Sequence, residues 1–151
     1  MAFIFEFMKG MLLVSLIITV AVYLVVAFGT KRVLDYYGHT YPWLAFIPFG
    51  NLIALTQCMR TDEFGNIKIF GSDLQRDIFQ WWPIILLVCG CIPGIGAFLV
   101  LAINIIAGAH VYKDLLSSES NQDETVLGWV CGVIPIVWVV MTYIRFKRVN
   151  Y

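Results

Sequence analysis

Long uncharged stretches alternate with short polar segments along the chain. The first stretch, residues 10–30, holds 21 uncharged residues between Lys9 and Lys31. As a helix it would be about 32 Å long, enough to cross a hydrocarbon core of roughly 30 Å. We therefore predict a first membrane span over about 10–30. A cleaved signal peptide would need a shorter apolar core and a small-residue cleavage site, so we expect this segment to be retained.

The second uncharged stretch is interrupted by residues that disturb a helix. It holds 24 residues between Asp35 and Arg60, but Pro48, Gly50 and Asn51 lie within it. A short span over about 42–58 and an interfacial or re-entrant segment both fit this pattern, because the backbone groups freed at a proline need protein or water partners. We favour a span and leave the re-entrant alternative open.

A polar loop over residues 60–80 follows. It contains a short alternation of apolar and polar residues at 67–70, and then Ser72 and Gln75 in the spacing of a helix capping box. The capping box predicts that a helix begins near Asp73 and carries apolar residues towards the bilayer interface.

The third uncharged stretch, residues 78–112, is too long for one crossing. Its 35 residues would measure about 52 Å as a straight helix. Pro93 and Gly94 provide the obvious break, and we predict a kinked helix with an interfacial beginning and a span over about 88–112. An acidic loop at 117–124 and a final span over about 125–144 complete the pattern.

These segments predict a single all-α domain over residues 1–151, a polytopic membrane protein of three or four transmembrane helices with Pro/Gly kinks. Basic residues favour the cytoplasmic side of a membrane. A four-span arrangement places seven of the ten basic residues on the cytoplasmic side, and a three-span arrangement places eight of the ten there. Both arrangements predict a cytoplasmic C-terminus and an external loop 117–124, whereas the side of the N-terminus depends on whether 42–58 crosses.

The composition agrees with a membrane protein. Hydrophobic residues make up 60% of the chain and charged residues only 13%, which is more apolar surface than a soluble domain of this size buries. The net charge is zero and there is no basic run, so nothing indicates a nucleic-acid partner. We expect an integral protein of the cell membrane.

Three six-residue segments resemble one another and end in an Ile-Pro step: 43–48, 88–93 and 130–135. The second and third match at five of six positions. Internal duplication of broken helices is common in transporters, yet proline and glycine are also simply frequent in membrane helices. The repeat alone favours the second explanation.

Two longer stretches, PWLAFIPFGN at 42–51 and WWPIILLVCGCIP at 81–93, carry a resemblance to a family. They resemble small uncharacterised bacterial multi-spanning membrane proteins that have a P-x-W-x-A-x-I-P-x-x-N type segment and a W-W-x-x-L-L-x-x-I-P helix. The resemblance covers roughly 41–144 and departs from the family at Gly50, where an aromatic residue is usual. It implies a bacterial integral membrane protein and brings no activity, cofactor or site residue with it.

The residues that usually carry chemistry are sparse. Four cysteines lie in apolar segments, where we interpret them as small buried hydrophobes, and the two closest are one residue too near for a Cys-x-x-Cys pair. His39 and His110 are the only histidines and lie near different predicted membrane edges, so no zinc site is expected. We predict no catalytic residue, no metal and no cofactor. The cysteines are Cys58, Cys89, Cys91 and Cys131.

Polar residues inside predicted spans are costly and therefore candidates for a site. They could surround a solute or form hydrogen bonds between helices, and we favour the second role. The candidates are Asn51, Gln57, Asn104 and His110.

The sequence thus favours a non-enzymatic accessory, assembly or interaction subunit of a larger membrane complex. Its expected partners are the lipid bilayer and other membrane subunits or a second copy of itself. A small oligomeric transporter or channel component is one alternative, and it predicts that Asn51 and Asn104 line a water-filled path. A bacterial toxin-immunity membrane protein is the other.

Overall fold

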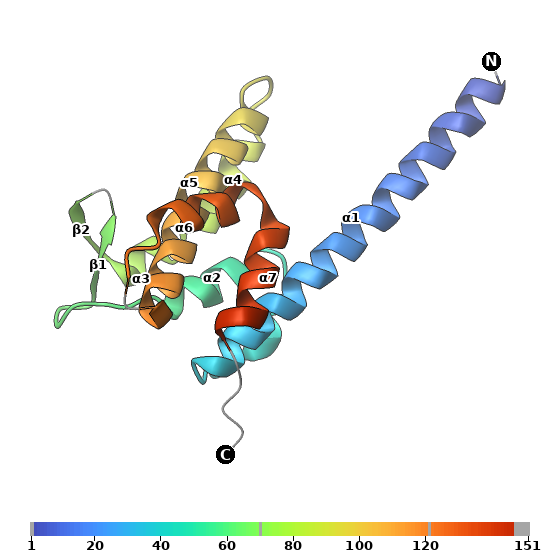
Figure 1. Ribbon diagram of the computed structural model, residues 1–151. Helices are drawn as coiled ribbons and strands as arrows, with labels where there is room; N and C mark the ends of the chain where they lie inside the picture. The colour runs from blue at the N-terminus through green and yellow to red at the C-terminus, as the bar shows by residue number, and fades with distance from the viewer. Residues whose placement is uncertain (1, 70, 121, 147–151) are drawn as a thin grey trace.

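The computed structural model describes residues 2–69, 71–120 and 122–146, with side chains from Phe5 onward, and it is mostly helical (Figure 1). The predicted helical class is therefore confirmed, with one small β-hairpin added. The elements in chain order are α1 Ala2–Tyr36, η1 Pro42–Phe46, α2 Gly50–Gln57, β1 Asn66–Ile69, β2 Ser72–Gln75, α3 Arg76–Phe79, α4 Trp82–Gly90, α5 Gly96–Ser120, α6 Thr125–Val133 and α7 Pro135–Arg145.

Helix α1 projects from the rest of the molecule as a long arm (Figure 1). Every residue from 5 to 22 is exposed, and packing begins only in the C-terminal part of the helix. There Phe28 meets Phe46 of η1 edge to face, with ring centroids 5.1 Å apart. Two helical segments, Phe5–Tyr36 and Gly96–Ser120, are long and apolar enough to cross a membrane.

The third uncharged stretch, predicted as one kinked helix with a span over about 88–112, folds as a helical hairpin of α4 and α5, and α5 is the candidate span within it. The break at Pro93 and Gly94 is confirmed, and Gly94 takes a φ of +86°, which suits a residue without a Cβ. Helix α4 then packs antiparallel to α5, so that Trp82 and Leu86 lie against Ala107. Because the turn at Pro93 and Gly94 reverses the chain, the start of α4 and the end of α5 lie at the same end of the hairpin.

The segment predicted as a span over 125–144 is not one continuous helix. It is divided at Ile134, whose extended backbone (φ −120°, ψ 91°) precedes Pro135, as expected for a residue before proline. The Arg145 guanidinium at the end of α7 lies 3.2 Å from the Glu124 carboxylate just before α6. The two ends of this segment are therefore neighbours and cannot lie on opposite sides of a layer roughly 30 Å thick.

The same contact bears on the expected sidedness. Loop 117–124 and the end of α7 were predicted on opposite sides, yet Glu124 binds Arg145, and Arg32 donates to the Phe146 carbonyl at 2.8 Å. Both regions lie on one face. Helix α5 itself continues through Ser120, so only the later part of the acidic loop is a connection, and the tail at 147–151 lies outside the described residues.

The ambiguous segment 42–58 returns to where it began. Short helices η1 and α2 are joined by a turn at Pro48 and Phe49, and Phe49 has a φ of 65°. The His39 ring nitrogen Nε2 lies 2.8 Å from Gln57 Oε1, which closes the segment at its two ends. The two ends of this segment are therefore neighbours, and it is not one straight helix.

The polar loop contains a β-hairpin in place of the helix predicted near Asp73. Strands β1 and β2 pair antiparallel, with Asn66 opposite Gln75 and Ile69 opposite Ser72. Gly71, at a φ of +81°, turns the chain between them. Ser72 and Gln75 thus lie in a strand, and the helix that follows, α3, begins only at Arg76.

The main core lies where α1, α2, α5, α6 and α7 meet. Trp138 is fully buried at its centre, tilted against the Tyr112 ring with centroids 4.4 Å apart and near Phe146 at 6.2 Å. Leu34, Leu55 and Leu115 fill the same cluster, each no more than 1% exposed. This core fixes the ends of the helices next to one another.

Candidate functional site

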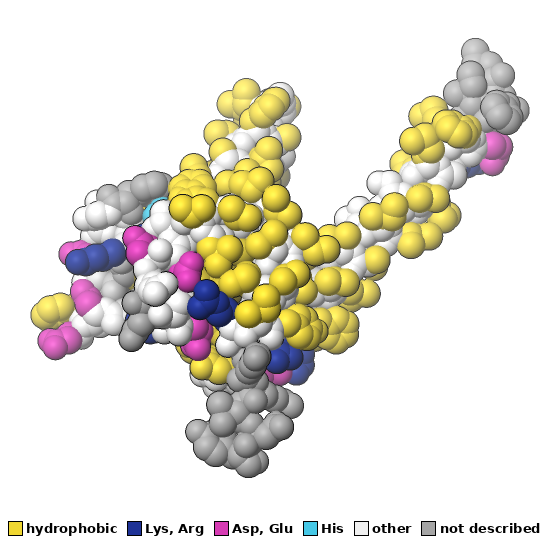
Figure 2. All heavy atoms as spheres, in the orientation of Figure 1, with side chains coloured by type: hydrophobic (Ala, Val, Ile, Leu, Met, Phe, Trp, Pro, Cys, Tyr) yellow, Lys and Arg dark blue, Asp and Glu magenta, His cyan; other side chains and the backbone are white. Residues whose placement is uncertain are grey.

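The polar side chains gather on one face, the end of the molecule away from the free part of α1. Figure 2 shows hydrophobic side chains along α1 and over the α4–α5 hairpin, whereas most charges lie around the β-hairpin and the last turns of α1 and α7. We call this face the polar layer. Its members are Lys31, Arg32, Asp35, Tyr36, Tyr37, His39, Gln57, Arg60, Arg76, Gln80, Lys113, Asp114, Ser117, Ser118, Glu119, Asp123, Glu124 and Arg145.

Two hydroxyls from the end of α1 bind the end of α5. Tyr36 Oη donates to Glu119 Oε2 at 2.8 Å, and Tyr37 Oη donates to the other carboxylate oxygen at 3.5 Å. The side chain of Arg32 reaches the carbonyl of Phe146 beyond α7. Three helix ends that are far apart in the sequence are thereby held at one level.

Arg60 fastens the chain after α2 to the last turns of α5. Its backbone N–H donates to Asp114 Oδ2 at 2.9 Å, and its Nε donates to Ser118 Oγ at 2.8 Å. A second guanidinium nitrogen donates to the Ser118 carbonyl. Because charge-assisted bonds are stronger than neutral ones, Arg60 acts here as a structural clamp.

A short chain of amides continues the polar layer towards α4. Gln57 contacts His39 through Oε1 and donates through Nε2 to Gln80 Oε1 at 2.8 Å. Arg76 Nη1 donates to the Gln57 carbonyl at 3.2 Å. Gln57, a predicted candidate for a polar contact within the membrane, thus joins three segments at the polar layer.

Acidic side chains in the loops organise their own turns. Asp62 accepts from the backbone N–H of Asn66 at 2.7 Å and of Phe64 at 2.9 Å, and these bonds hold the pKa of Asp62 below its ordinary value. Asp123 accepts from the Thr125 hydroxyl and lies 3.2 Å from Lys113, which lowers its pKa as well. Both carboxylates are ionised and bound within the protein.

A second set of polar side chains lines a cavity of about 610 Å³ between α1, the η1–α2 turn, α4 and α5. It contains Tyr23, Asn51 and Asn104, each from a different helix, among apolar side chains. Asn51 is 9% exposed, and the Tyr23 hydroxyl oxygen is buried without a hydrogen-bond partner in the described part of the chain. Neutral amide and hydroxyl groups can donate hydrogen bonds to an uncharged polar group and accept them from it.

The four sequence candidates therefore separate. Asn51 and Asn104 share the cavity, Gln57 belongs to the polar layer, and His110 lies in a different hollow of about 410 Å³ beside Lys113 and Asp114. The His110 ring also meets Trp129 edge to face, with centroids 6.4 Å apart.

The sequence reasoning missed Tyr23. A phenol in the middle of an apolar run is a detectable signal, because a buried hydroxyl usually needs a partner. Among the residues that the structure describes, no three His, Cys, Asp or Glu side chains come close enough to hold a metal ion.

Comparison with known proteins adds no further assignment. No protein-family model, no curated protein and no solved structure matches this chain.

Proposed function

We propose that this chain is an integral membrane protein that serves as an accessory, assembly or interaction subunit of a larger membrane complex, with no enzymatic activity of its own. One observation carries the proposal: residues 5–22 of α1 are exposed throughout, so about half of the longest helix packs on nothing in the described chain. An apolar helix of this length lies in a bilayer, where a helix from another subunit can pack against it.

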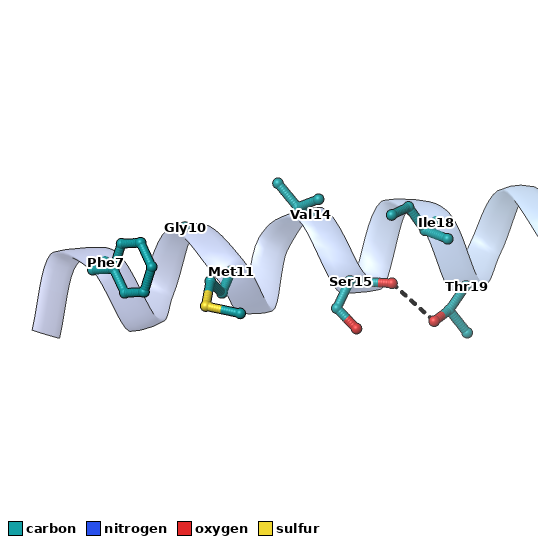
Figure 3. A pocket seen from close by; sticks show the side chains of 7 residues that line it. All are labelled: Phe7, Gly10, Met11, Val14, Ser15, Ile18 and Thr19. Atoms are coloured by element: carbon teal, nitrogen blue, oxygen red, sulfur yellow. Dashed lines mark hydrogen bonds between the residues drawn. The ribbon is translucent and has the colours of Figure 1, made fainter. Parts of the chain in front are cut away.

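One face of this free arm supports docking of a neighbouring helix. Its residues, three and four positions apart, line a shallow hollow, and Figure 3 shows how their side chains are placed along the helix. Gly10 leaves the backbone open to close approach, and Thr19 donates its hydroxyl to the Ser15 carbonyl at 2.8 Å, so this hydroxyl hydrogen is already bound. The face consists of Phe7, Gly10, Met11, Val14, Ser15, Ile18 and Thr19.

The polar layer supports the same proposal. Its charged groups bind one another, as Arg60 does with Asp114 and Arg145 does with Glu124. Such pairs position helices and leave the described polar layer without an evident nucleophile and base arrangement. A rigid polar layer beside a free apolar helix favours docking of a partner over catalysis.

Replacing Val14 with Trp is expected to weaken binding of the partner helix. Val14 lines this face (Figure 3), and added bulk at a packed helix face costs about 1–3 kcal/mol, or roughly fivefold to 150-fold in affinity. The measurement is purification in mild detergent followed by mass spectrometry of the intact assembly, with the recovered partner per chain compared with wild type.

Val20→Trp is the matched control. Val20 is also exposed but points about 120° away from Val14 around the helix and does not line the hollow. Partner recovery should stay near wild type in this variant. Equal loss in both variants, or a wild-type chain that purifies as a lone monomer, would contradict the proposed docking face.

The cavity with Asn51 and Asn104 favours a small transporter or channel component as a second candidate function. Both amides line it, as that function requires, although its remaining lining is mostly apolar. Under this function, Asn51→Leu together with Asn104→Leu should reduce solute flux into vesicles by at least about tenfold, since each lost polar contact costs about 1 kcal/mol.

Gln122→Leu removes an amide from an exposed loop and should leave flux unchanged. If the double variant transports solute as well as this control does, the second candidate function is excluded.

A further inference from the structure

We propose that α1 is the only described segment that crosses the bilayer, and that the three later apolar segments enter and leave it on the same side. The polar layer then lies at the cytoplasmic surface, with the start of α1 on the opposite side. This topology concerns contact with lipid and does not depend on a protein partner.

The two ends of the first segment, residues 39–57, contact each other. His39, just after α1, meets Gln57, the last residue of α2, at 2.8 Å. Between them the chain rises along α1 to the level where Phe46 contacts Phe28, two turns before the end of that helix, and then returns. The turn at Pro48 and Phe49 therefore lies inside the layer that α1 crosses.

The second segment begins and ends at the same level. Gln80, which precedes α4, is bonded to Gln57, while Asp114 near the end of α5 is bonded to Arg60, three residues after Gln57. The α4–α5 turn extends away from this level, in the same general direction as the N-terminus (Figure 1). Its residues 91–96 carry no charge, which suits a turn that stays within the bilayer.

The third segment is closed by the pair Glu124 and Arg145 at 3.2 Å. Helices of nine and eleven residues separate these two side chains, and neither helix is long enough to cross a bilayer alone. The segment therefore dips into the bilayer and returns.

The Ile-Pro repeat in the sequence now has a structural meaning. Each of the three steps lies at the turn of one hairpin: Pro48 between η1 and α2, Pro93 between α4 and α5, and Ile134 between α6 and α7, with Pro135 as the first residue of α7. Ile47 and Ile134 both have extended backbones, with φ of −98° and −120°. A residue before proline is driven out of the helical region, so this dipeptide ends one arm of each hairpin.

The distribution of basic residues indicates which side of the membrane the polar layer faces. Of the described lysines and arginines, only Lys9 lies at the free end of α1, and the other seven lie at the polar layer or in its β-hairpin. The 21 uncharged residues between Lys9 and Lys31 span about 32 Å, which matches the hydrocarbon thickness. Because basic residues concentrate on the cytoplasmic side, the polar layer faces the cytoplasm.

The test is cysteine labelling in a chain whose four native cysteines are replaced. Single variants Lys9→Cys, Phe64→Cys and Gln122→Cys place a thiol at exposed positions, and Ile136→Cys places one beside the third turn. A membrane-impermeant maleimide should label position 9 in sealed right-side-out vesicles and positions 64 and 122 only in inside-out vesicles. Position 136 should resist labelling from either side.

Labelling of position 122 in right-side-out vesicles, or of positions 9 and 122 from the same side, would overturn the topology. A second measurement does not depend on vesicle orientation. In the double variant Glu124→Cys with Arg145→Cys, a short bis-maleimide cross-linker should join the two thiols within one chain, detected by peptide mass spectrometry, because the native side chains meet there. Lys9→Cys with Arg145→Cys is the control and should not be cross-linked within one chain; the reverse pattern would also overturn the proposal.

Discussion

Replacing Trp138 with Ala is expected to cost about 3–5 kcal/mol of unfolding free energy, because this side chain is fully buried where several helices meet. Its ring contacts Tyr112 of α5, and Phe146, which it also approaches, packs in turn on Tyr36 with centroids 5.4 Å apart. Loss of the indole would therefore loosen α7 from both α5 and α1. The measurement is an unfolding titration in mixed detergent micelles, followed by far-ultraviolet circular dichroism.

Trp138→Phe is the matched control. The indole nitrogen is buried without a hydrogen-bond partner in the described part of the chain, so its removal breaks no bond there. Phenylalanine also preserves most of the aromatic contact with Tyr112. We expect less than half of the loss seen with alanine, and equal losses in the two variants would show that aromatic packing is not what Trp138 contributes.

The sequence predicts where the apolar segments lie better than it predicts that the two ends of a segment meet at the polar layer. The uncharged run of α1 and the break at Pro93 both follow from local pattern. The ion pair of Glu124 with Arg145 joins residues that are 21 positions apart, and the length of an uncharged stretch cannot reveal it. For the same reason, counting charges on alternate sides could not reveal that Glu124 lies next to the end of α7.

The β-hairpin shows a local signal overridden by its neighbours. Ser72 and Gln75 have capping-box spacing, yet each pairs with a residue of β1, and Ile67 of that strand is only 2% exposed. Burial of Ile67 in the core stabilises the strand, whereas an exposed capping box would stabilise a helix by only about 1 kcal/mol. The alternation at 67–70 was the more informative pattern.

The candidate site was predicted in part. Asn51 and Asn104, which only the transporter alternative placed together, share a cavity, although one follows a turn and the other lies in the middle of α5. Gln57 and His110 belong elsewhere because the hairpins bring their segments back to the polar layer. Residue type therefore identified the candidates, but only the tertiary fold could group them.

Glycines on α6 determine how closely it approaches α5. A Cβ on Gly128 would lie 2.6 Å from the Lys113 Cβ and 2.8 Å from the Ala109 carbonyl oxygen, while one on Gly132 would lie 3.0 Å from the Ile105 carbonyl oxygen. The two glycines are four residues apart and so share one helix face. This is the small-xxx-small spacing that permits close helix pairs in membranes, and its role here is visible only once α5 is beside α6.

Gly128→Ala is therefore expected to destabilise the protein by about 2–3 kcal/mol, because the new methyl group meets the backbone of α5 and the helices must separate. Gly108→Ala is the control within the same helix pair. There the nearest atom is the Tyr112 Cε2 at 3.5 Å, an ordinary contact, and alanine favours the helix by up to about 1 kcal/mol. The same unfolding titration measures both. Equal stability of the two variants would mean that α5 and α6 do not pack through Gly128.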